Sequence, residues 1–258
     1  AKFANKPEVL DANLKALHAG ALIAENSEFF GVKYEVGSAP LTPGKYRNMG
    51  GNAALAMGLV AGVKLAGLKL FYGSYPITPA SDVLHTLAGY KNYGVTTFQA
   101  EDEIAAVCSA IGASWAGTLG ATGTSGPGLA LKGEALGLSV MIEQPLIVVD
   151  VQRAGPSTGM PTKTEQADLN QAIFGRNGET PLPVVSCSSP GDCFEAAIEA
   201  VRIAVTYMTP VILLSDGYIG NGAEPFLVPD ASSLPKIPHQ FSQEGDTRQP
   251  FERDPETL

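Results

Sequence analysis

The sequence predicts an α/β fold, namely a parallel sheet of about six strands with helices on both faces. Short apolar runs such as PLIVVDV (145–151) and PVILLSD (210–216) lack the polar alternation of a half-exposed strand. Such runs are typical of strands that are buried on both faces. They alternate along the chain with helical stretches, and alternating βα units build a parallel sheet that helices cover.

Apolar runs and helical periodicity place the individual elements. The predicted strands span residues 68–73, 95–99, 118–123, 145–151, 182–187 and 210–216. The predicted helices span residues 79–91, 101–116, 128–142, 165–174 and 191–207. A further predicted helix over 50–67 is rich in glycine and alanine, which suits close packing against the sheet.

Composition divides the chain into three parts. Residues 1–47 hold an amphipathic helix over 1–20 and a linker with Gly and Pro, and residues 48–225 form the α/β domain. Residues 226–258 are rich in Pro, Ser and charged residues without periodicity, so we expect an extended tail there. The ending FERDPETL indicates that this tail leads into a domain that the chain lacks.

The charge balance argues against a nucleic-acid partner. Of 258 residues, 17 are Lys or Arg and 26 are Asp or Glu, which gives a net charge of -9, whereas phosphate binding favours a basic surface. No run approaches the ~20 apolar residues of a membrane span, and the N-terminus lacks the apolar core of a signal peptide. The three cysteines form no CxxC motif, so we expect unpaired thiols, a cytoplasmic protein and no metal site on this chain.

Polar residues follow four of the predicted strands, at the edge where the ligands of open parallel sheets gather. After the first strand comes SYPITPAS, in which Pro76 and Pro79 flank Thr78. Pro79 suits the first turn of a helix, so Thr78 is expected to act as the N-cap. The alternative is that the prolines fix the Thr78 hydroxyl and the adjacent amides for an anionic ligand at the helix N-terminus.

The next two loops also carry residues that suit ligand binding. In QAEDE, Asp102 and Glu103 suit the helix dipole, whereas Glu101 lies nearest the strand end and is expected to point into the crevice. A charged helix start without further function is the alternative. The loop GATGTSGPG lets the backbone approach a ligand closely, but it matches neither the Walker motif nor GxGxxG spacing.

The fourth loop begins with Arg153 at the end of an apolar strand and continues with the hydroxyl residues Ser157, Thr158 and Thr162. An arginine held at that position suits bidentate binding of a carboxylate. A surface arginine in a flexible loop is the alternative. Each loop alone is a weak signal, and the convergence of four polar strand ends on one crevice is the stronger indication.

Four motifs together resemble the alpha subunit of 2-oxoacid:ferredoxin oxidoreductases, and more narrowly the 2-oxoglutarate type. They are YPITP (75–79), QAEDE (99–103), TSGPG (124–128) and RAGPSTGMPTKTEQ (153–166), and the resemblance covers residues 48–225. It implies the pyrimidine-binding domain for thiamin diphosphate. It also implies that residues 1–47 are the end of a preceding gamma-type domain.

The resemblance implies roles for individual residues. Glu101 matches the catalytic glutamate that hydrogen-bonds the aminopyrimidine ring, and a carboxylate there promotes the imino tautomer of the cofactor. The other residues implied at the cofactor are Tyr75, Pro76, Ser125 and Gly126. The residues implied at the 2-oxoacid are Thr78, Arg153, Thr158 and Thr162.

The resemblance further implies that this chain holds half of an active site. The family binds the diphosphate and magnesium through a GDG-type motif on a beta subunit, and DGYIGN at 216–221 does not match that motif. Three scattered cysteines cannot hold a four-iron cluster, so the iron–sulfur cluster is expected on the partner. The implied assembly is a dimer of heterodimers that oxidises a 2-oxoacid, passes electrons to ferredoxin and forms an acyl-coenzyme A.

The substrate stays open between pyruvate, branched-chain oxoacids and 2-oxoglutarate, of which 2-oxoglutarate is favoured. Two other functions stay open as well. One is a non-redox thiamin-dependent enzyme component, against which the YPITP motif and the Arg153 loop argue. The other is a non-catalytic α/β module that binds a nucleotide or serves assembly, which predicts no response to thiamin diphosphate.

Overall fold

The structure, a computed structural model, describes residues 3–27, 32, 34–239, 245 and 252–256. The chain folds as two compact units, Ala1–Pro43 and Gly44–Leu258. The first unit contains helix α1 (Pro7–Asn26), which buries none of its residues. Among the described residues, no helix is both long and apolar enough to cross a membrane.

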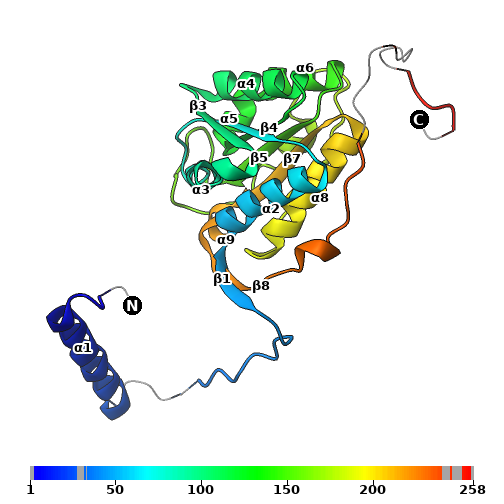
Figure 1. The fold of residues 1–258 in the computed structure, drawn as a ribbon. Coiled ribbons are helices and arrows are strands. Elements are labelled where there is room, and N and C mark those ends of the chain that lie inside the picture. Colours follow the sequence, from blue (N-terminus) through cyan, green and yellow to red (C-terminus); the bar gives the residue numbers. More distant parts are fainter. Residues whose placement is uncertain (1–2, 28–31, 33, 240–244, 246–251, 257–258) are drawn as a thin grey trace. The chain divides into compact units, whose positions relative to one another are not determined.

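The second unit is built on a parallel sheet of six strands, which confirms the predicted fold class (Figure 1). The strand order is β3-β2-β4-β5-β7-β6, and every neighbouring pair is parallel. The strands are β2 (Leu70–Ser74), β3 (Val95–Gln99), β4 (Leu119–Thr124), β5 (Leu146–Gln152), β6 (Val184–Ser186) and β7 (Pro210–Asp216).

Helices cover both faces of the sheet (Figure 1). One face carries α2 (Gly51–Leu65), α3 (Ser81–Ala88) and α8 (Asp192–Tyr207), and the other carries α4 (Glu103–Trp115), α5 (Gly126–Leu131) and α6 (Gly133–Met141). Two short helices, α7 (Leu169–Phe174) and α9 (Gly217–Asn221), lie in connections, as do the 3₁₀ turns η1 (Lys91–Tyr93) and η2 (Ala231–Ser233).

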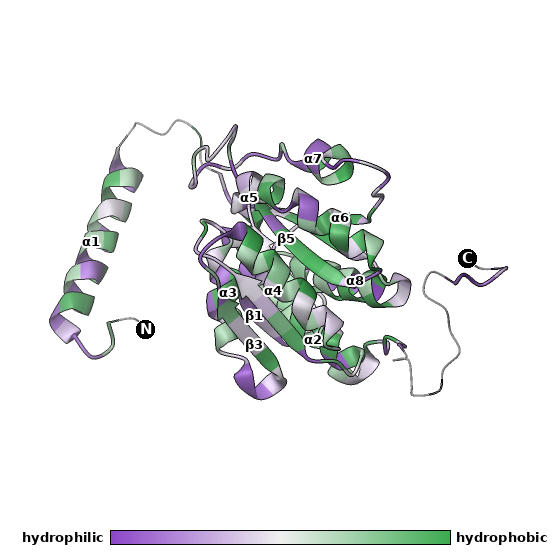
Figure 2. Ribbon diagram, turned by 90° about the horizontal axis from the view of Figure 1, so that it is seen from above, coloured by the Kyte–Doolittle hydropathy of each residue, from purple (hydrophilic) through white to green (hydrophobic). Residues whose placement is uncertain are grey.

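The central strand β5 shows why the apolar runs are uninterrupted. Ile147 and Val149 pack into the core on the α2 and α8 side, whereas Leu146 and Val148 pack into the core on the α4 and α6 side. Successive side chains of a strand point to opposite faces, so a strand covered on both faces needs apolar residues at successive positions. Figure 2 shows β5 as hydrophobic over most of its length.

The structure corrects the predicted N-cap at Thr78. Helix α3 begins at Ser81, its N-cap is Ala80, and residues 78–80 form a turn before it. The Ser81 hydroxyl accepts a hydrogen bond from the Ile77 N–H at 2.8 Å and donates one to the Ile77 carbonyl at 3.0 Å. The loop is therefore closed by Ser81, and the Thr78 hydroxyl does not cap the helix.

Several predicted boundaries also differ from the structure. The helix predicted over 128–142 is divided into α5 and α6 at Lys132, and the one predicted over 165–174 begins only at Leu169. Two strands were not predicted at all. β1 (Tyr46–Gly50) and β8 (Ala223–Leu227) form an antiparallel pair, and such a pairing of distant segments leaves no local periodicity in the sequence.

Helix α2 packs closely against α8, and glycine makes this approach possible. A Cβ atom added at Gly58 would overlap the backbone carbonyl of Phe194 and lie 2.8 Å from the Cβ of Ala197. At Gly62 an added Cβ would lie 2.8 Å from a methyl carbon of Val201. The small residues of α2 thus serve a helix–helix contact more than the predicted contact with the sheet.

We predict that Gly58→Ala destabilises the domain, because the backbone of α8 must move to admit the methyl group. Overpacking of this kind costs about 1–3 kcal/mol, which urea unfolding of the two proteins would measure. Gly112→Ala is the matched control, since an added Cβ at this helical position meets no atom within 4 Å. The control is expected to gain up to ~1 kcal/mol from helix propensity, and equal effects at the two sites would contradict the prediction.

Candidate active site

Four neighbouring strands bring the predicted site residues to one edge of the sheet. The carboxyl ends of β3, β2, β4 and β5 lie side by side in that order, and each is followed by one of the four polar loops. The chain runs from β2 outward to β3 and then returns across β2 to β4. Ligands of open α/β sheets bind at such a reversal of strand order, so the crevice between β2 and β4 is the candidate site.

Hydrogen bonds connect the loops across the strand ends. The Ala100 N–H donates to the Ser74 carbonyl at 2.7 Å, which joins the end of β3 to the end of β2. The Tyr75 hydroxyl lies 3.0 Å from the Thr124 hydroxyl and joins β2 to β4. A Cβ added at Gly128 would overlap both hydroxyl oxygens, which explains why the TSGPG loop needs glycine there.

Ser125 and Arg153 extend these connections to β5. The Ser125 hydroxyl donates to the Val151 carbonyl at 2.8 Å and lies 3.5 Å from the Thr78 carbonyl. The Arg153 guanidinium donates from Nη1 to the Thr78 carbonyl and from Nη2 to the Thr158 carbonyl, both at 2.7 Å. The YPITP loop and the loop after β5 are therefore held together by one side chain.

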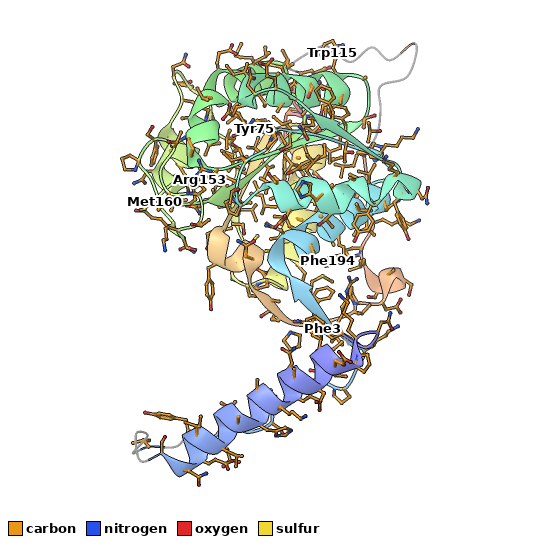
Figure 3. All side chains as sticks on the ribbon, turned by 90° about the vertical axis from the view of Figure 1, so that its left-hand side faces the viewer. Phe3, Tyr75, Trp115, Arg153, Met160 and Phe194 are labelled. Carbon is orange, nitrogen blue, oxygen red and sulfur yellow. The ribbon has the colours of Figure 1, made fainter. Side chains whose placement is uncertain are left out.

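Arg153 is 7% exposed, so it is not the surface arginine of the alternative reading. Its Nε atom is buried and has no hydrogen-bond partner among the described residues. Within the same residues, no carboxylate forms an ion pair with it. Figure 3 shows Arg153 on the same side of the molecule as Tyr75. A buried guanidinium without a counter-charge favours an anion close by.

Glu101 and Asp102 occupy the turn between β3 and α4, and their roles differ. Asp102 is the N-cap of α4 and accepts a hydrogen bond from the Ala105 N–H at 2.7 Å, as the helix-dipole interpretation predicts. Glu101 is exposed beside it and lies at the strand end. The carboxylate of Glu101 is thus available to a ligand, whereas that of Asp102 is used by the helix.

The remaining predicted cofactor residues lie in the loops after β2 and β4. Tyr75, Ser125 and Gly126 are buried, while Pro76 is exposed. Burial raises the pKa of Tyr75 far above its ordinary value, so its phenol stays neutral. These residues can shape the site through van der Waals and backbone contacts.

Three of the four predicted substrate residues are threonines in the loops after β2 and β5. Thr78, Thr158 and Thr162 are exposed. The carbonyls of Thr78 and Thr158 both accept hydrogen bonds from Arg153, which brings their loops together. Thr162 lies further along the same loop, and no hydrogen bond among the described residues connects it to Arg153.

A pair of neighbouring carboxyl groups, one of them buried, was missed by the sequence analysis. Asp150 lies inside β5 and is fully buried, and neither of its carboxylate oxygens has a hydrogen-bond partner among the described residues. Its carboxyl neighbour is Asp168, the N-cap of α7. Burial and the neighbouring Asp168 carboxylate raise the pKa of Asp150 well above its ordinary value. Burial also raises the pKa of Asp168. A proton on Asp150 can therefore be donated to Asp168, and the signal for it was a carboxylate within the apolar run PLIVVDV.

Asp168 also fills the start of α5. A Cβ added at Gly126 would lie 2.5 Å from one oxygen of the Asp168 carboxylate. The Asp168 N–H donates to Gln152 at 3.0 Å. The position that an anion could take at this helix start is thus occupied by a carboxylate of the chain itself.

Neither of two cavities in the domain includes Glu101, Thr78 or Arg153. A cavity of about 630 Å³ lies between the 164–166 loop, Ser188–Pro190 and α9, and one of about 960 Å³ lies at the opposite edge of the sheet. In the described part of the chain, no group of three His, Cys, Asp or Glu side chains could hold a metal ion. Neither cavity is therefore the candidate site.

The comparison with known proteins agrees with this geometry. The family model described as pyruvate flavodoxin/ferredoxin oxidoreductase, thiamine diphosphate-binding, matches residues 61–257. The chain belongs to this family. Its six-stranded parallel sheet with flanking helices is the thiamine diphosphate-binding fold of these enzymes.

Individual relatives are consistent with the family. The chain is 61% identical over 257 residues to the 2-oxoglutarate oxidoreductase subunit KorA of Mycobacterium tuberculosis, which covers 100% of this chain and 39% of that protein. It is 40% identical over 197 residues to the 2-oxoglutarate synthase subunit KorA of Methanothermobacter marburgensis, which covers 76% of this chain and 51% of that protein. The chain thus spans about half or less of the length of these relatives.

A solved structure shows the same fold. The 2-oxoglutarate:ferredoxin oxidoreductase from Magnetococcus marinus, with 2-oxoglutarate, coenzyme A and succinyl-CoA bound, superimposes with a TM-score of 0.83 at 38% identity. The match covers 97% of this chain and 43% of that chain. The residues of the candidate site fit the pyrimidine end of thiamin diphosphate better than its phosphates, because Glu101 has an exposed carboxylate while the Asp168 carboxylate lies against the start of α5.

We predict that Asp150→Asn reduces the pH dependence of stability. Folding raises the pKa of the Asp150 carboxyl above its ordinary value of 3.8, so the protonated acid stabilises the folded state. This contribution is lost as the pH rises from 3.8 toward the pKa of the folded protein. Each pH unit in this window removes up to about 1.4 kcal/mol. The amide of Asn can donate as the protonated acid does, but it does not titrate.

Urea unfolding between about pH 5 and pH 8 would measure this slope for wild type and Asp150→Asn. Glu195→Gln is the control, because Glu195 is an exposed carboxylate in α8. The control should keep the wild-type slope. An unchanged slope in Asp150→Asn would show that Asp150 holds no proton in the folded protein.

Proposed function

We propose that this chain is the alpha-type component of a 2-oxoacid:ferredoxin oxidoreductase. The enzyme would decarboxylate a 2-oxoacid oxidatively to an acyl-coenzyme A and deliver the electrons to ferredoxin, with 2-oxoglutarate as the preferred substrate. The observation that carries the proposal is the cluster of four strand ends around the β2–β4 crevice, with an exposed Glu101 and a buried Arg153. The names of the relatives support the substrate.

Glu101 is the proposed catalytic residue. Thiamin diphosphate, when bound, supplies the reactive thiazolium carbon and the electron sink. The Glu101 carboxylate, exposed at the end of β3, would hold a proton at the aminopyrimidine ring nitrogen. Tyr75, Pro76, Ser125 and Gly126 would contact the ring from below, since they surround the same strand ends.

Arg153 and its neighbours are the proposed substrate residues. The guanidinium is buried without a carboxylate partner among the described residues, and a 2-oxoacid would bring the missing negative charge. Arg153 also holds the carbonyls of Thr78 and Thr158. The hydroxyls of Thr78, Thr158 and Thr162, all exposed, would then face the substrate.

A beta-type partner would complete the active site. The proposed partner carries the diphosphate and magnesium site and the iron–sulfur cluster, and the assembly is a dimer of heterodimers. Asp168 at the start of α5 supports this idea, because its carboxylate leaves no free helix start for a diphosphate there. The three cysteines are free thiols, of which Cys108 is exposed while Cys187 and Cys193 are buried.

An apolar surface on α4 and α6 is the proposed contact with that partner. This α4–α6 face consists of exposed side chains on neighbouring helices, namely Ile104, Cys108, Trp115, Leu138 and Met141. Helix α4 carries no charged residue after Glu103, although a helix on a free surface normally has a polar face. Trp115 is 72% exposed and stands on the outer side of α4 in Figure 3. Exposed apolar surface of this kind marks interaction sites.

The free thiols support a cytoplasmic location for the complex, because disulfides are rare in that compartment.

We predict that the double variant Leu138→Glu/Met141→Glu does not assemble with the beta-type subunit. Two carboxylates would be buried without partners in the interface, which costs several kcal/mol, and co-purification should fall at least about tenfold. The isolated chain should fold as wild type, because both side chains are exposed. Tyr207→Glu is the control and should assemble normally, because Tyr207 lies on α8 at the other face of the sheet. Retained assembly of the double variant would exclude the α4–α6 face as the contact with the partner.

We predict that the complex reduces a viologen acceptor with 2-oxoglutarate and coenzyme A, and that Glu101→Gln lowers kcat by at least about a hundredfold. General acid–base groups contribute about 10²–10⁴-fold. Glu101 is exposed, so the melting temperature should not change. Glu134→Gln, an exposed carboxylate in α6, is the control. Wild-type turnover in Glu101→Gln would remove this residue from catalysis, and preference for pyruvate in a substrate panel would reassign the substrate.

A further inference from the structure

Lys132 is a fully buried lysine at the junction of α5 and α6. Its Nζ donates to the carbonyl of Glu103, the first residue of α4, at 2.7 Å. The same Nζ lies 5.2 Å from the ring centroid of Tyr75. One ammonium group thus contacts the start of α4 and the YPITP loop while its own backbone follows the TSGPG loop.

The groups around Lys132 come from two elements. Glu103, Asp102 and Cys108 on α4 favour the charged ammonium, and the Tyr75 ring after β2 faces it. Burial has the larger effect and lowers the pKa of Lys132 to about 8. The side chain is therefore mostly charged at neutral pH, although it lies out of water.

A buried ammonium is an unfavourable choice for filling space in a core. Desolvation of a charge costs free energy that a few hydrogen bonds and aromatic contacts repay only in part. The lowered pKa of Lys132 is a direct sign of this cost. A methionine of similar length would fill the same space without a charge. The position of the ammonium, rather than core packing, is what the lysine adds.

The contacts of Lys132 bear on the turn that holds Glu101. On one side of this turn, the Ala100 N–H is fixed to the Ser74 carbonyl at 2.7 Å. On the other side, the Glu103 carbonyl is fixed by Lys132 at the same distance. Glu101 lies between these two fixed points and its own side chain is exposed. Its orientation over the crevice therefore depends on both.

We propose that Lys132 is a positioning residue for Glu101, which it holds at the β2–β4 crevice by fixing the start of α4. This role rests on the proposed function, because it gives Lys132 a task only if Glu101 contacts the cofactor. The alternative is that Lys132 supports the fold alone. The two ideas differ in what happens to stability and activity when the charge is removed.

Lys132→Met is the decisive variant. If Lys132 is a positioning residue, the isolated chain should be at least as stable as wild type below pH 8, because the buried charge is gone. Hydrogen exchange of the backbone amides in residues 100–105 should become at least about tenfold faster, the loss expected for one hydrogen bond from a charged donor. In the complex, kcat should fall at least about tenfold, while KM for the 2-oxoacid should change less than about twofold.

The pH dependence of stability gives an independent readout. The lysine is charged in the unfolded chain up to its ordinary pKa of 10.5 and in the folded chain only up to about 8. Between these values the unfolded state binds more protons, so wild-type stability rises with pH relative to Lys132→Met. The stability difference between the two proteins should therefore shrink as pH rises through this window.

Ser139→Ala is the matched control. Ser139 is buried on α6 and donates to the Gln144 carbonyl at 2.8 Å, away from the Glu101 turn. This variant should lose stability and keep both the amide exchange of residues 100–105 and kcat. Unchanged exchange in Lys132→Met would overturn the inference, whatever the enzyme does. Faster exchange with normal kcat in Lys132→Met would also overturn the inference, provided that Glu101→Gln impairs the complex. If Glu101→Gln leaves the complex unaffected, the proposed function is refuted instead.

Discussion

The candidate site depends on the two hydrogen bonds from the Arg153 guanidinium. They join the carbonyl of Thr78, in the loop after β2, to that of Thr158, in the loop after β5. Loops at strand ends are otherwise free to move independently. A planar guanidinium fixes two acceptors in one plane, so the position of each loop is set by the other. The hydroxyl-bearing residues above the crevice can then act as one surface.

Buried ionisable side chains gather at the same edge of the sheet. Arg153, Lys132 and Asp150 are each less than 10% exposed, and each lies inside a predicted motif or within four residues of one. Apolar side chains would stabilise these positions more easily. Proteins keep such groups where activity needs a fixed charge or donor, at a cost in stability. Their distribution agrees with the carboxyl edge of the sheet as the candidate functional edge.

Two kinds of surface agree with an incomplete active site. The carboxylate of Asp168 lies against the start of α5, where a phosphate could otherwise bind, which agrees with the proposal that this chain contacts only one end of the cofactor. The α4–α6 face begins at the turn of Glu101 and exposes large apolar side chains. A partner that covers this face would lie beside the crevice. Binding of the partner and completion of the site are therefore one event in this interpretation.

The sequence by itself determined the parallel α/β fold and the four polar strand ends, because uninterrupted apolar runs and Gly/Pro-rich loops are local signals. It also placed Asp102 correctly at a helix start. Only the tertiary structure decided the β1–β8 pair, the burial of Arg153 and the contacts of Lys132, since each joins residues far apart in the chain. Thr78 shows the limit most clearly. Its local pattern predicted an N-cap, but the Ser81 hydroxyl forms the hydrogen bonds to Ile77 that close the loop before α3. The Thr78 side chain is exposed instead, where a ligand can reach it.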